Sequence, residues 1–431
     1  MIKMSAFGSL ILIFAIIATF IIPSSGPLSG ASIGVLEMSQ REKADYVNIR
    51  QNVDIPAELP YLAQFSEDDM SGDFVCDVTS SVSSGYYSKP QTVMLESKYD
   101  LYYTTDGTIP DINSTKYDPA TGIYIDENTF LTVRAFNNGK VSTVLMGSYV
   151  IFKDTTSYKY AYGYNSLNET DQYIYEKMYD AISNFETEFD VGNYGISFSR
   201  LNKIMFILNY DNPMLFQAPN YLNIKKGTQD DVRQVNIYYA YNEAECELRK
   251  RLCEQRVDEI FSEADGSKSL MDYLVLIHRS ILSKTVYYDD TDEMDIYEAY
   301  GVLVNGQGVC ESYSRAFEYV CQRMGLDNLL IVGDSEGVSH MWNMIKMDNE
   351  WYHIDLTWDD GDNDEIYCDF FNVDDKTITT YGYREISPIA REGDVENGKE
   401  IYNYYEIPEA YSMYYNYSYY YFGEVYDELY Y

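Results

Sequence analysis

The sequence predicts an α+β protein in which an N-terminal β-sandwich precedes a domain built from a cysteine-bearing helix and an antiparallel sheet. Three observations support this fold class. Short alternating segments divided by turn signals occupy residues 74–152. Apolar residues at helical spacing follow Cys310. Farther on, two strand-like segments flank the dipeptide Asp348-Asn349.

The N-terminal residues 1–31 have the pattern of a secretory signal. Lys3 precedes an uncharged apolar run, Phe7–Ile22, and a stretch of small residues then ends at Ala31, where we expect cleavage. The apolar run is short for a helix that spans a bilayer, which favours a signal peptide over an uncleaved membrane anchor. The chain is therefore expected to be secreted or on the cell surface, with membrane anchoring through this segment as the alternative. Residues 32–73 are polar and acidic and are interpreted as a linker.

Residues 74–152 are predicted to form a small antiparallel sandwich. Leu101–Thr105 ends in Asp106-Gly107, and Phe130–Ala135 ends in Asn137-Asn138-Gly139. The stretch Tyr102–Pro110, with the segments around residues 114–117 and 133–136, resembles the chitobiase/β-hexosaminidase C-terminal-type module. This resemblance implies an immunoglobulin-like accessory domain and no activity. Exposed tyrosines there could stack on a glycan or cell wall, although tyrosines more often form ordinary cross-strand pairs.

Cys310 is predicted to lie in the first turn of a helix. Gly306 and Gly308 interrupt the chain just before it, and one apolar stripe follows it, made of Tyr313, Ala316, Phe317, Val320, Cys321 and Met324. Unpaired amide groups and the helix dipole favour a thiolate at such a position, so we expect a lowered thiol pKa. The competing interpretation is that Cys310 is a small buried hydrophobic residue, as Cys321 on the stripe is expected to be.

A predicted hairpin places a histidine and an aspartate close together. A two-residue loop at Asp348-Asn349 suits a type I′ turn and pairs Met347 with Glu350. In that register, His340 and Asp355 become diagonal neighbours on one face of the strands 340–347 and 351–359. A slip of one residue would place them on opposite faces. Before the hairpin, residues 329–333 are predicted to form a short buried strand.

The three residue types at these positions suit thiol chemistry. A thiol needs a base to become a good nucleophile, and the base needs a third group that fixes its tautomer and orientation. The chain has only 3 histidines. His353 competes with His340 for the role of base because it shares a strand face with Asp355. His278 is interpreted as a helix residue satisfied by a local hydrogen bond.

Three segments resemble the core motifs of the bacterial transglutaminase-like superfamily. They are Gly308–Tyr313 (Gly-Val-Cys-Glu-Ser-Tyr), His340–Asn343 (His-Met-Trp-Asn) and Trp351–Asp360, which contains Ile-Asp-Leu-Thr-Trp-Asp-Asp. The resemblance covers about residues 156–390. It implies a papain-like fold in which the cysteine helix packs on a sheet that bears the histidine and aspartate.

Residue by residue, the resemblance implies Cys310 as the nucleophile, His340 as the base and Asp355 as the orienting acid, with no cofactor and no metal. The chain departs from the family pattern at Ser312, Ser314, Met341 and Asn349, and none of these departures removes a catalytic group. The domain is expected to span residues 153–395. Helices are expected at 170–184, 243–262 and 271–283 around its core.

The resulting hypothesis is an exported thiol acyl-transfer enzyme that acts through a cysteine thioester on protein or peptide amides, either crosslinking or hydrolysing them. One alternative is a cysteine peptidase acting on cell-wall or extracellular peptides. Another is a non-catalytic surface protein that binds peptide or glycan. No residue decides between transfer and hydrolysis.

Composition excludes some partners. The net charge of −38 and the isoelectric point near 4.2 exclude generic nucleic-acid binding, which needs a basic surface. The 6 cysteines are not expected to form a disulfide scaffold. If Cys310 is a free thiol, the other five cannot all pair within the chain, and Cys246 and Cys253 on one helix would be too distant to bridge.

Two segments leave alternatives open. Asp359–Glu365 gathers oxygen ligands that could bind calcium, but it lacks the EF-hand spacing, which favours a solvated acidic loop. Residues 396–431 are rich in tyrosine and are interpreted as a strand completing the catalytic domain, an adhesive tail, or both.

Overall fold

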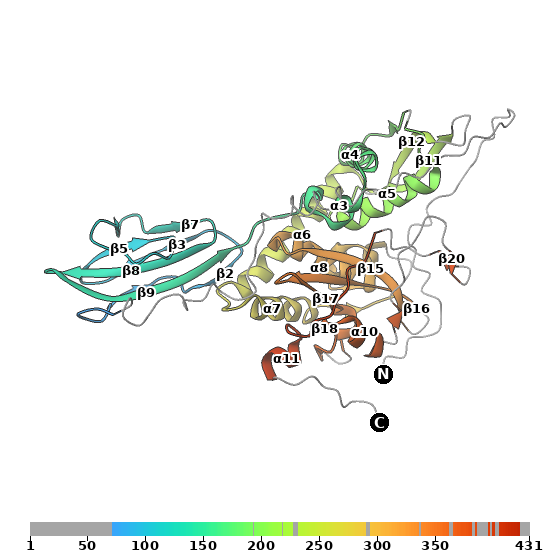
Figure 1. Ribbon diagram of the computed structural model, residues 1–431. Coiled ribbons are helices and arrows are strands. Elements are labelled where there is room, and N and C mark those ends of the chain that lie inside the picture. The colour runs from blue at the N-terminus through green and yellow to red at the C-terminus, as the bar shows by residue number, and fades with distance from the viewer. Residues whose placement is uncertain are drawn as a thin grey trace, which may run out of the picture.

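The computed structural model describes residues 71–422 apart from short gaps at 193, 218, 227–231, 290–293, 336–337, 362–364, 382–383, 386–394, 397–398 and 401–404. The predicted signal segment and nearly all of the predicted linker lie outside the described residues. Within them, no helix combines the length and apolar character needed to cross a membrane. The described chain forms a β-sandwich that extends from one side of a larger α+β domain (Figure 1).

The N-terminal module is a strand-rich sandwich, as predicted, although residues 85–87 pair with residues 149–151 in parallel and not in the expected antiparallel sense. Its main sheet has the order β2-β9-β8-β5-β6, and the pairs β3–β7 and β1–β4 accompany it. The strands are β1 (Thr79–Ser80), β2 (Gly85–Tyr87), β3 (Gln91–Val93), β4 (Leu95–Glu96), β5 (Asp100–Thr104), β6 (Thr115–Lys116), β7 (Ile123–Ile125), β8 (Thr129–Asn137) and β9 (Lys140–Ile151). Asn138 and Gly139 both have positive φ, so the β8–β9 hairpin turns where the Asn-Asn-Gly signal predicted.

The sandwich has its own core, which includes Leu101, Ile123 and Val133. Tyr124 on β7 is exposed, whereas Tyr102 on β5 packs edge-on against Phe136 at 5.1 Å between ring centroids. The latter is the cross-strand use of tyrosine, and Tyr149 similarly lies against Tyr87.

The larger domain is organised around a five-stranded antiparallel sheet of order β18-β17-β16-β15-β19. Its strands are β15 (Asn328–Ser335), β16 (Val338–Met347), β17 (Glu350–Ile354), β18 (Phe371–Val373) and β19 (Arg384–Glu385). Helix α8 (Cys310–Met324) packs against β15 and β16 (Figure 1). The predicted arrangement, a cysteine helix on an antiparallel sheet, is therefore present.

Both faces of this sheet are buried, which explains why β16 is apolar at nearly every position. Ile345 and Met347 belong to one core together with Phe317 of α8. Trp342 and Met344 point the other way, into a second core. A sheet covered on both faces lacks simple polar–apolar alternation.

The surrounding elements agree with the expected helices. The long ones are α4 (Glu169–Ser183), α5 (Phe198–Asp211), α6 (Glu243–Ala264) and α7 (Leu270–Leu282). The shorter ones are η1 (Tyr158–Tyr160), α3 (Tyr162–Ser166), η2 (Met294–Tyr297), η3 (Gly301–Asn305), α9 (Leu356–Asp359), α10 (Asp375–Tyr381) and α11 (Tyr417–Phe422). A second sheet, β10-β12-β11, is formed by β10 (Glu188–Asp190), β11 (Pro219–Lys226) and β12 (Val232–Tyr239). Four two-residue strands form two further pairs, β13 (Val286–Tyr287) with β14 (Gln307–Gly308) and β20 (Val395–Glu396) with β21 (Lys399–Glu400).

The junction between the sandwich and the larger domain is a packed interface. Tyr86, Val150 and Phe152 are buried in the same core as α6 and α7. The Phe152 ring meets that of Tyr273 edge-on at 4.8 Å between centroids. The backbone of Tyr86 exchanges hydrogen bonds with the α6–α7 turn, accepting from Gly266 N–H at 2.8 Å. These contacts fix the sandwich on the domain in one orientation.

Within the described part of the tyrosine-rich C-terminus, residues 417–422 form helix α11 and not the expected strand. The side chain of Asn416 accepts hydrogen bonds from the backbone N–H groups of Ser418 and Tyr419 and so starts α11. Tyr421 then donates a hydrogen bond to Asp272 of α7 at 2.6 Å. The tyrosines bind this segment to the domain surface through their hydroxyl groups as well as their rings.

All six cysteines are free. Cys246, Cys253 and Cys321 are buried, and the prediction that Cys321 is a core residue is confirmed.

Candidate active site

Cys310 is the first residue of α8, as predicted. The chain reaches it through Gly306, whose φ of 68° ends η3, and through β14, whose Gly308 is tightly enclosed. A Cβ added at Gly308 would lie 2.6 Å from the Cβ of Ser312. The Ser312 hydroxyl donates to the carbonyl of Glu298 and accepts the N–H of Val302 at 3.0 Å. This serine therefore fixes the start of α8 against the preceding turn.

The predicted hairpin register is confirmed. Met347 pairs with Glu350 and Asn343 with Ile354. Asp348 and Asn349 have φ values of 46° and 66°, the positive pair that a type I′ turn requires.

This register brings His340 and Asp355 into contact. The distance from His340 Nε2 to Asp355 Oδ2 is 2.7 Å. The His340 side chain is 8% exposed and that of Asp355 is 1% exposed, so little water competes for this hydrogen bond. Because the carboxylate accepts, Nε2 carries the proton, and Nδ1 is the nitrogen that can act as a base toward a thiol.

Asp355 is not a strand residue, which corrects the prediction for residues 351–359. Strand β17 ends at Ile354, and Leu356–Asp359 form α9 with Asp355 as its N-cap. The second carboxylate oxygen, Oδ1, accepts the backbone N–H of Trp358 at 3.1 Å. Each Asp355 oxygen therefore has its own donor, and the carboxylate cannot rotate without losing one of them.

Two tryptophans enclose the imidazole of His340. The Trp342 ring is stacked with it at 5.9 Å between centroids and an interplanar angle of 17°. The Trp358 ring meets it edge-on at 6.2 Å. Contact with these rings limits the orientations that the imidazole can adopt.

His353, the competing base, is occupied by other partners. Its Nδ1 accepts a hydrogen bond from Trp342 Nε1 at 3.0 Å, and its Nε2 lies 2.8 Å from Asp375 Oδ1. Its side chain is fully buried. With both nitrogens committed, His353 cannot take a proton from Cys310 without breaking one of these bonds.

His278 does not make the local hydrogen bond that was predicted. Its Nε2 lies 3.0 Å from Asp359 Oδ2, on a residue 81 positions away, and both side chains are fully buried. Since Asp359 belongs to α9, this contact adjoins the candidate site.

Asp359 and Asp360 also correct the predicted solvated acidic loop, whose residues 362–364 lie outside the described chain. Asp359 is buried against His278, and Asp360 accepts a hydrogen bond from the hydroxyl of Tyr313 on α8. In the described part of the chain, no group of three or more histidine, cysteine, aspartate or glutamate side chains is placed to hold a metal ion.

The environment of Cys310 raises its thiol pKa, opposite to the expected direction. Burial is the largest cause and raises the pKa to about 12; hydrogen bonds from the backbone of Met341 and Glu311 act the other way. The residue is 9% exposed and packs in an apolar cluster with Phe206 and Met341. The helix N-terminus does favour the thiolate, but it is outweighed by desolvation.

The same contacts locate Cys310 relative to the other two residues. Met341, whose backbone interacts with the thiol, directly follows His340 in β16. The Asp355 carboxylate is near enough to act electrostatically on the thiol. The backbone next to His340 and the carboxylate of its partner Asp355 therefore both act on the Cys310 thiol at the start of α8.

Tyr287 is a neighbour of Cys310 that the motif analysis assigned no role. It lies on β13, in register with Gly308 of β14, two residues before the thiol. Its side chain is 37% exposed, and burial, followed by the nearby Cys310 thiol, raises the pKa of its hydroxyl. The parallel β13–β14 pairing could not be read from the sequence, because each strand has only two residues.

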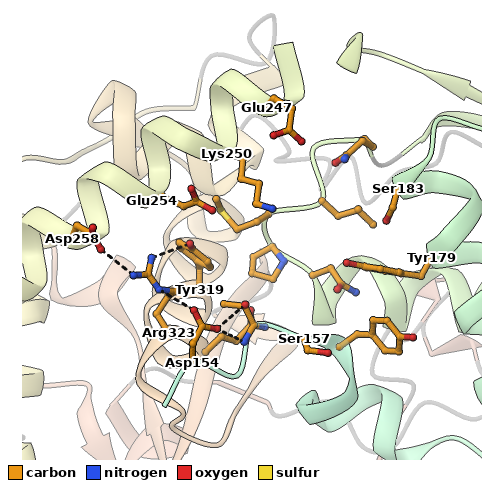
Figure 2. A pocket seen from close by; sticks show the side chains of 18 residues that line it. Asp154, Ser157, Tyr179, Ser183, Glu247, Lys250, Glu254, Asp258, Tyr319 and Arg323 are labelled. Atoms are coloured by element: carbon orange, nitrogen blue, oxygen red, sulfur yellow. Dashed lines mark hydrogen bonds and ion pairs between the residues drawn. The ribbon is translucent and has the colours of Figure 1, made fainter. Parts of the chain in front are cut away.

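A polar cleft of about 830 Å³ lies at the other end of α8 (Figure 2). It is lined by Tyr319 and Arg323 of α8 and by acidic residues of α6. Arg323 is held there by Asp258 at 2.9 Å and Asp154 at 3.3 Å (Figure 2). Roughly 18 Å of helix separates residue 322 from Cys310, so this cleft is distinct from the candidate site.

Comparison with known proteins identifies both modules. Residues 255–356 match the transglutaminase-like superfamily. Residues 82–146 match the chitobiase/β-hexosaminidase C-terminal domain. Both resemblances seen in the sequence are thereby confirmed. A comparison with curated proteins finds no match.

Three solved structures show distant likeness to this chain. A protein from Cytophaga hutchinsonii proposed to be a cysteine protease is 12% identical with a TM-score of 0.22, over 29% of this chain and 51% of that one. A protein described as a TGase is 14% identical with a TM-score of 0.26, over 65% and 78%. Red sea bream transglutaminase is 11% identical with a TM-score of 0.23, over 67% and 51%. The chain thus spans about half the length of the first and third proteins.

Proposed function

We propose that this protein is a thiol acyl-transfer enzyme in which Cys310 is the nucleophile, His340 the general base and Asp355 the residue that orients His340. The observation that carries the proposal is the buried 2.7 Å contact between His340 Nε2 and Asp355 Oδ2 beside the start of α8. The contact leaves Nδ1 as the basic nitrogen and supports the imidazolium that forms when His340 accepts a proton.

The chemistry begins with proton transfer from the Cys310 thiol to His340 Nδ1. A thiol pKa of about 12 means that the resting thiol is neutral at neutral pH. The thiolate therefore forms as the reaction starts, by transfer to His340, and attacks the carbonyl carbon of an amide.

The C–N bond of the amide then breaks, and His340 returns its proton to the departing amine, which leaves a thioester on Cys310. Amide groups in the first turn of α8 can donate hydrogen bonds to the oxyanion that precedes the thioester. A second nucleophile completes the cycle: water gives hydrolysis, and an amine gives a new amide. The substrate class is the amide group of a protein or peptide.

A trapping experiment tests this proposal. The full-length protein is incubated with a glutamine-containing peptide library, quenched in acid and digested, and an acyl adduct on the Cys310 peptide is sought by mass spectrometry. A labelled primary amine offered in parallel distinguishes transfer from hydrolysis. Cys310→Ala is the control that must lose the adduct. No adduct with any peptide, from a folded protein whose Cys310 is intact, contradicts the proposal.

We also propose that the protein is exported, on the basis of the N-terminal sequence pattern. A contact with cell wall or glycan through the sandwich is proposed from the resemblance of that module alone. The strongly negative charge is consistent with an exported soluble protein, and it would attract cationic amines. Fractionation of the native host and N-terminal sequencing of the mature chain test cleavage after Ala31.

A further inference from the structure

The three histidines of this chain all pair with aspartates, and both side chains are buried in the pairs of His278 and His340; only the His340 pair is used by the proposed mechanism. The pair formed by His278 and Asp359 is the most completely buried, with both side chains at 0% exposure. It connects α7 to the far end of α9, the four-residue helix that Asp355 caps. Burying a polar pair of this kind costs desolvation free energy. Apolar side chains of similar volume often stabilise a core at least as well as such a pair does.

The hydrogen bonds of Asp359 fix its carboxylate on both sides. Oδ2 accepts from His278 Nε2 at 3.0 Å, and Oδ1 accepts from the backbone N–H of Phe370 at 3.0 Å. Within the described residues, His278 Nδ1 has no hydrogen-bond partner. The single ring proton is therefore best placed on Nε2, where the carboxylate accepts it.

Phe370 carries this constraint to Asp355. Its backbone N–H is held by Asp359, and its carbonyl accepts the backbone N–H of Asp355 at 3.1 Å. The N–H of Asp359 in turn donates to the carbonyl of Asp355 at 3.2 Å. Asp355 is thus held at its N–H and at its C=O by two groups that both depend on Asp359.

Trp358 extends the same connection to His340. It lies between Asp355 and Asp359 in α9, its N–H is bound by Asp355, and its ring contacts those of Phe370 and His340. A displacement of Asp359 would therefore move the carboxylate and one wall of the imidazole together.

We propose that His278 and Asp359 form a positioning pair that holds Asp355 and Trp358 in the geometry required by His340. The inference rests on the proposed function, because it assigns the pair a role in the reactivity of the Cys310–His340–Asp355 site. Neither residue touches the reacting atoms. Their effect is exerted through Phe370 and α9.

The experiment uses the full-length protein and iodoacetamide as the probe. The rate of Cys310 alkylation is measured from pH 5 to 9 by mass spectrometry for the wild type, His278→Leu, His278→Gln and Asp359→Asn. Tyr273→Phe is the matched control: it removes a partly buried 2.9 Å hydrogen bond to Asp265 from the same helix, α7, on the side that meets the sandwich. Thermal unfolding of each variant is measured alongside.

We expect His278→Leu to slow Cys310 alkylation by about tenfold or more, since small misplacements of a supporting group cost up to about 100-fold in rate. The pH limb that reports ionisation of His340 should move to lower pH, because a displaced Asp355 stabilises the imidazolium less. His278→Gln retains an N–H donor of similar reach and should recover most of the rate. Asp359→Asn breaks the pair from its other member and should move the limb in the same direction.

Tyr273→Phe should lower the unfolding temperature while leaving the alkylation profile unchanged. A folded His278→Leu or Asp359→Asn protein with the wild-type rate and pH profile would show that the pair has only a structural role. Failure of the proposed function is a different result: the wild-type Cys310 itself would then react no faster than in His340→Gln.

Discussion

Replacing Asp355 by asparagine removes one charge while keeping the size and shape of the side chain. In the native protein, Oδ2 accepts from His340 Nε2 at 2.7 Å and Oδ1 accepts from Trp358 N–H at 3.1 Å. An amide offers one oxygen and one NH₂ group to these two donors. One of the two hydrogen bonds must therefore be lost or inverted.

The favourable orientation keeps the oxygen on Trp358, because asparagine is as good an N-cap as aspartate. Its NH₂ group then faces His340 and stabilises the tautomer with a bare Nε2 and a proton on Nδ1. That tautomer cannot take the proton of Cys310. We expect acyl-enzyme formation to slow by about 10⁴-fold, the size of effect that a wrong tautomer produces in a comparable triad.

Stability should change much less. Loss of one buried hydrogen bond to a charged group costs about 2 kcal/mol of unfolding free energy, and the retained cap preserves α9. Asp355→Ala is the comparison variant, because it also loses the cap, at a further cost of about 1 kcal/mol. Cys310→Ala sets the floor of activity, and Asp355→Asn should stay above it.

The assay pairs single-turnover acyl-enzyme formation with thermal and denaturant unfolding of the same preparations. A folded Asp355→Asn protein with activity within about tenfold of the wild type would refute the reasoning, since a tautomer that cannot accept the thiol proton should cost far more. The reasoning would also be refuted if Asp355→Asn, Asp355→Ala and Cys310→Ala lost activity equally and lost stability equally.

Three further predictions follow from the same geometry. Iodoacetamide should modify Cys310 before the fully buried Cys321. In His340→Gln, the alkylation rate of Cys310 should rise about tenfold per pH unit through pH 9, as expected for a lone thiol with a pKa near 12. An alkylation rate of Cys310 that is the same with and without His340 would contradict this. His340→Gln should abolish acyl-enzyme formation whereas His353→Gln should chiefly lower the unfolding temperature; equal total loss from both, with folding retained, would undo the assignment. Phe152→Ala should lower the free energy of unfolding by about 3 to 5 kcal/mol, measured by denaturant unfolding. Residue 152 lies outside the segment that matches the transglutaminase-like superfamily. An unchanged denaturation midpoint would mean that the junction contributes no packing energy.

Local geometry could be predicted from the sequence where turn residues or helical spacing determine it. The type I′ dipeptide set the hairpin register, and the register placed His340 against Asp355. The helical spacing after Cys310 placed the thiol at the first position of α8. In each case the decisive information lies within about fifteen residues of the chain.

Contacts between distant segments were not predictable in this way. The His278–Asp359 pair joins residues 81 positions apart, and no pattern in either segment indicates the other. Residues 351–359 contain aromatic and β-branched side chains, and this composition predicts a strand. In the structure, the Asp355 side chain instead caps a short helix there. The direction of the Cys310 pKa shift depends on burial by three-dimensional neighbours, which outweighs the helix terminus visible in the sequence.

The packed junction between the sandwich and the larger domain sets a fixed reach. Strand β9 has 12 residues and ends at the junction, so the sandwich extends roughly 40 Å from it. A flexible tether would let the Cys310 site explore a sphere around whatever the sandwich holds. Here the buried Tyr86 and Phe152 restrict it to one distance and one approach direction. If the sandwich anchors the protein and Cys310 is the nucleophile, as proposed above, amides at that spacing from the anchoring point would be modified, and nearer or farther ones on the same anchor would be spared.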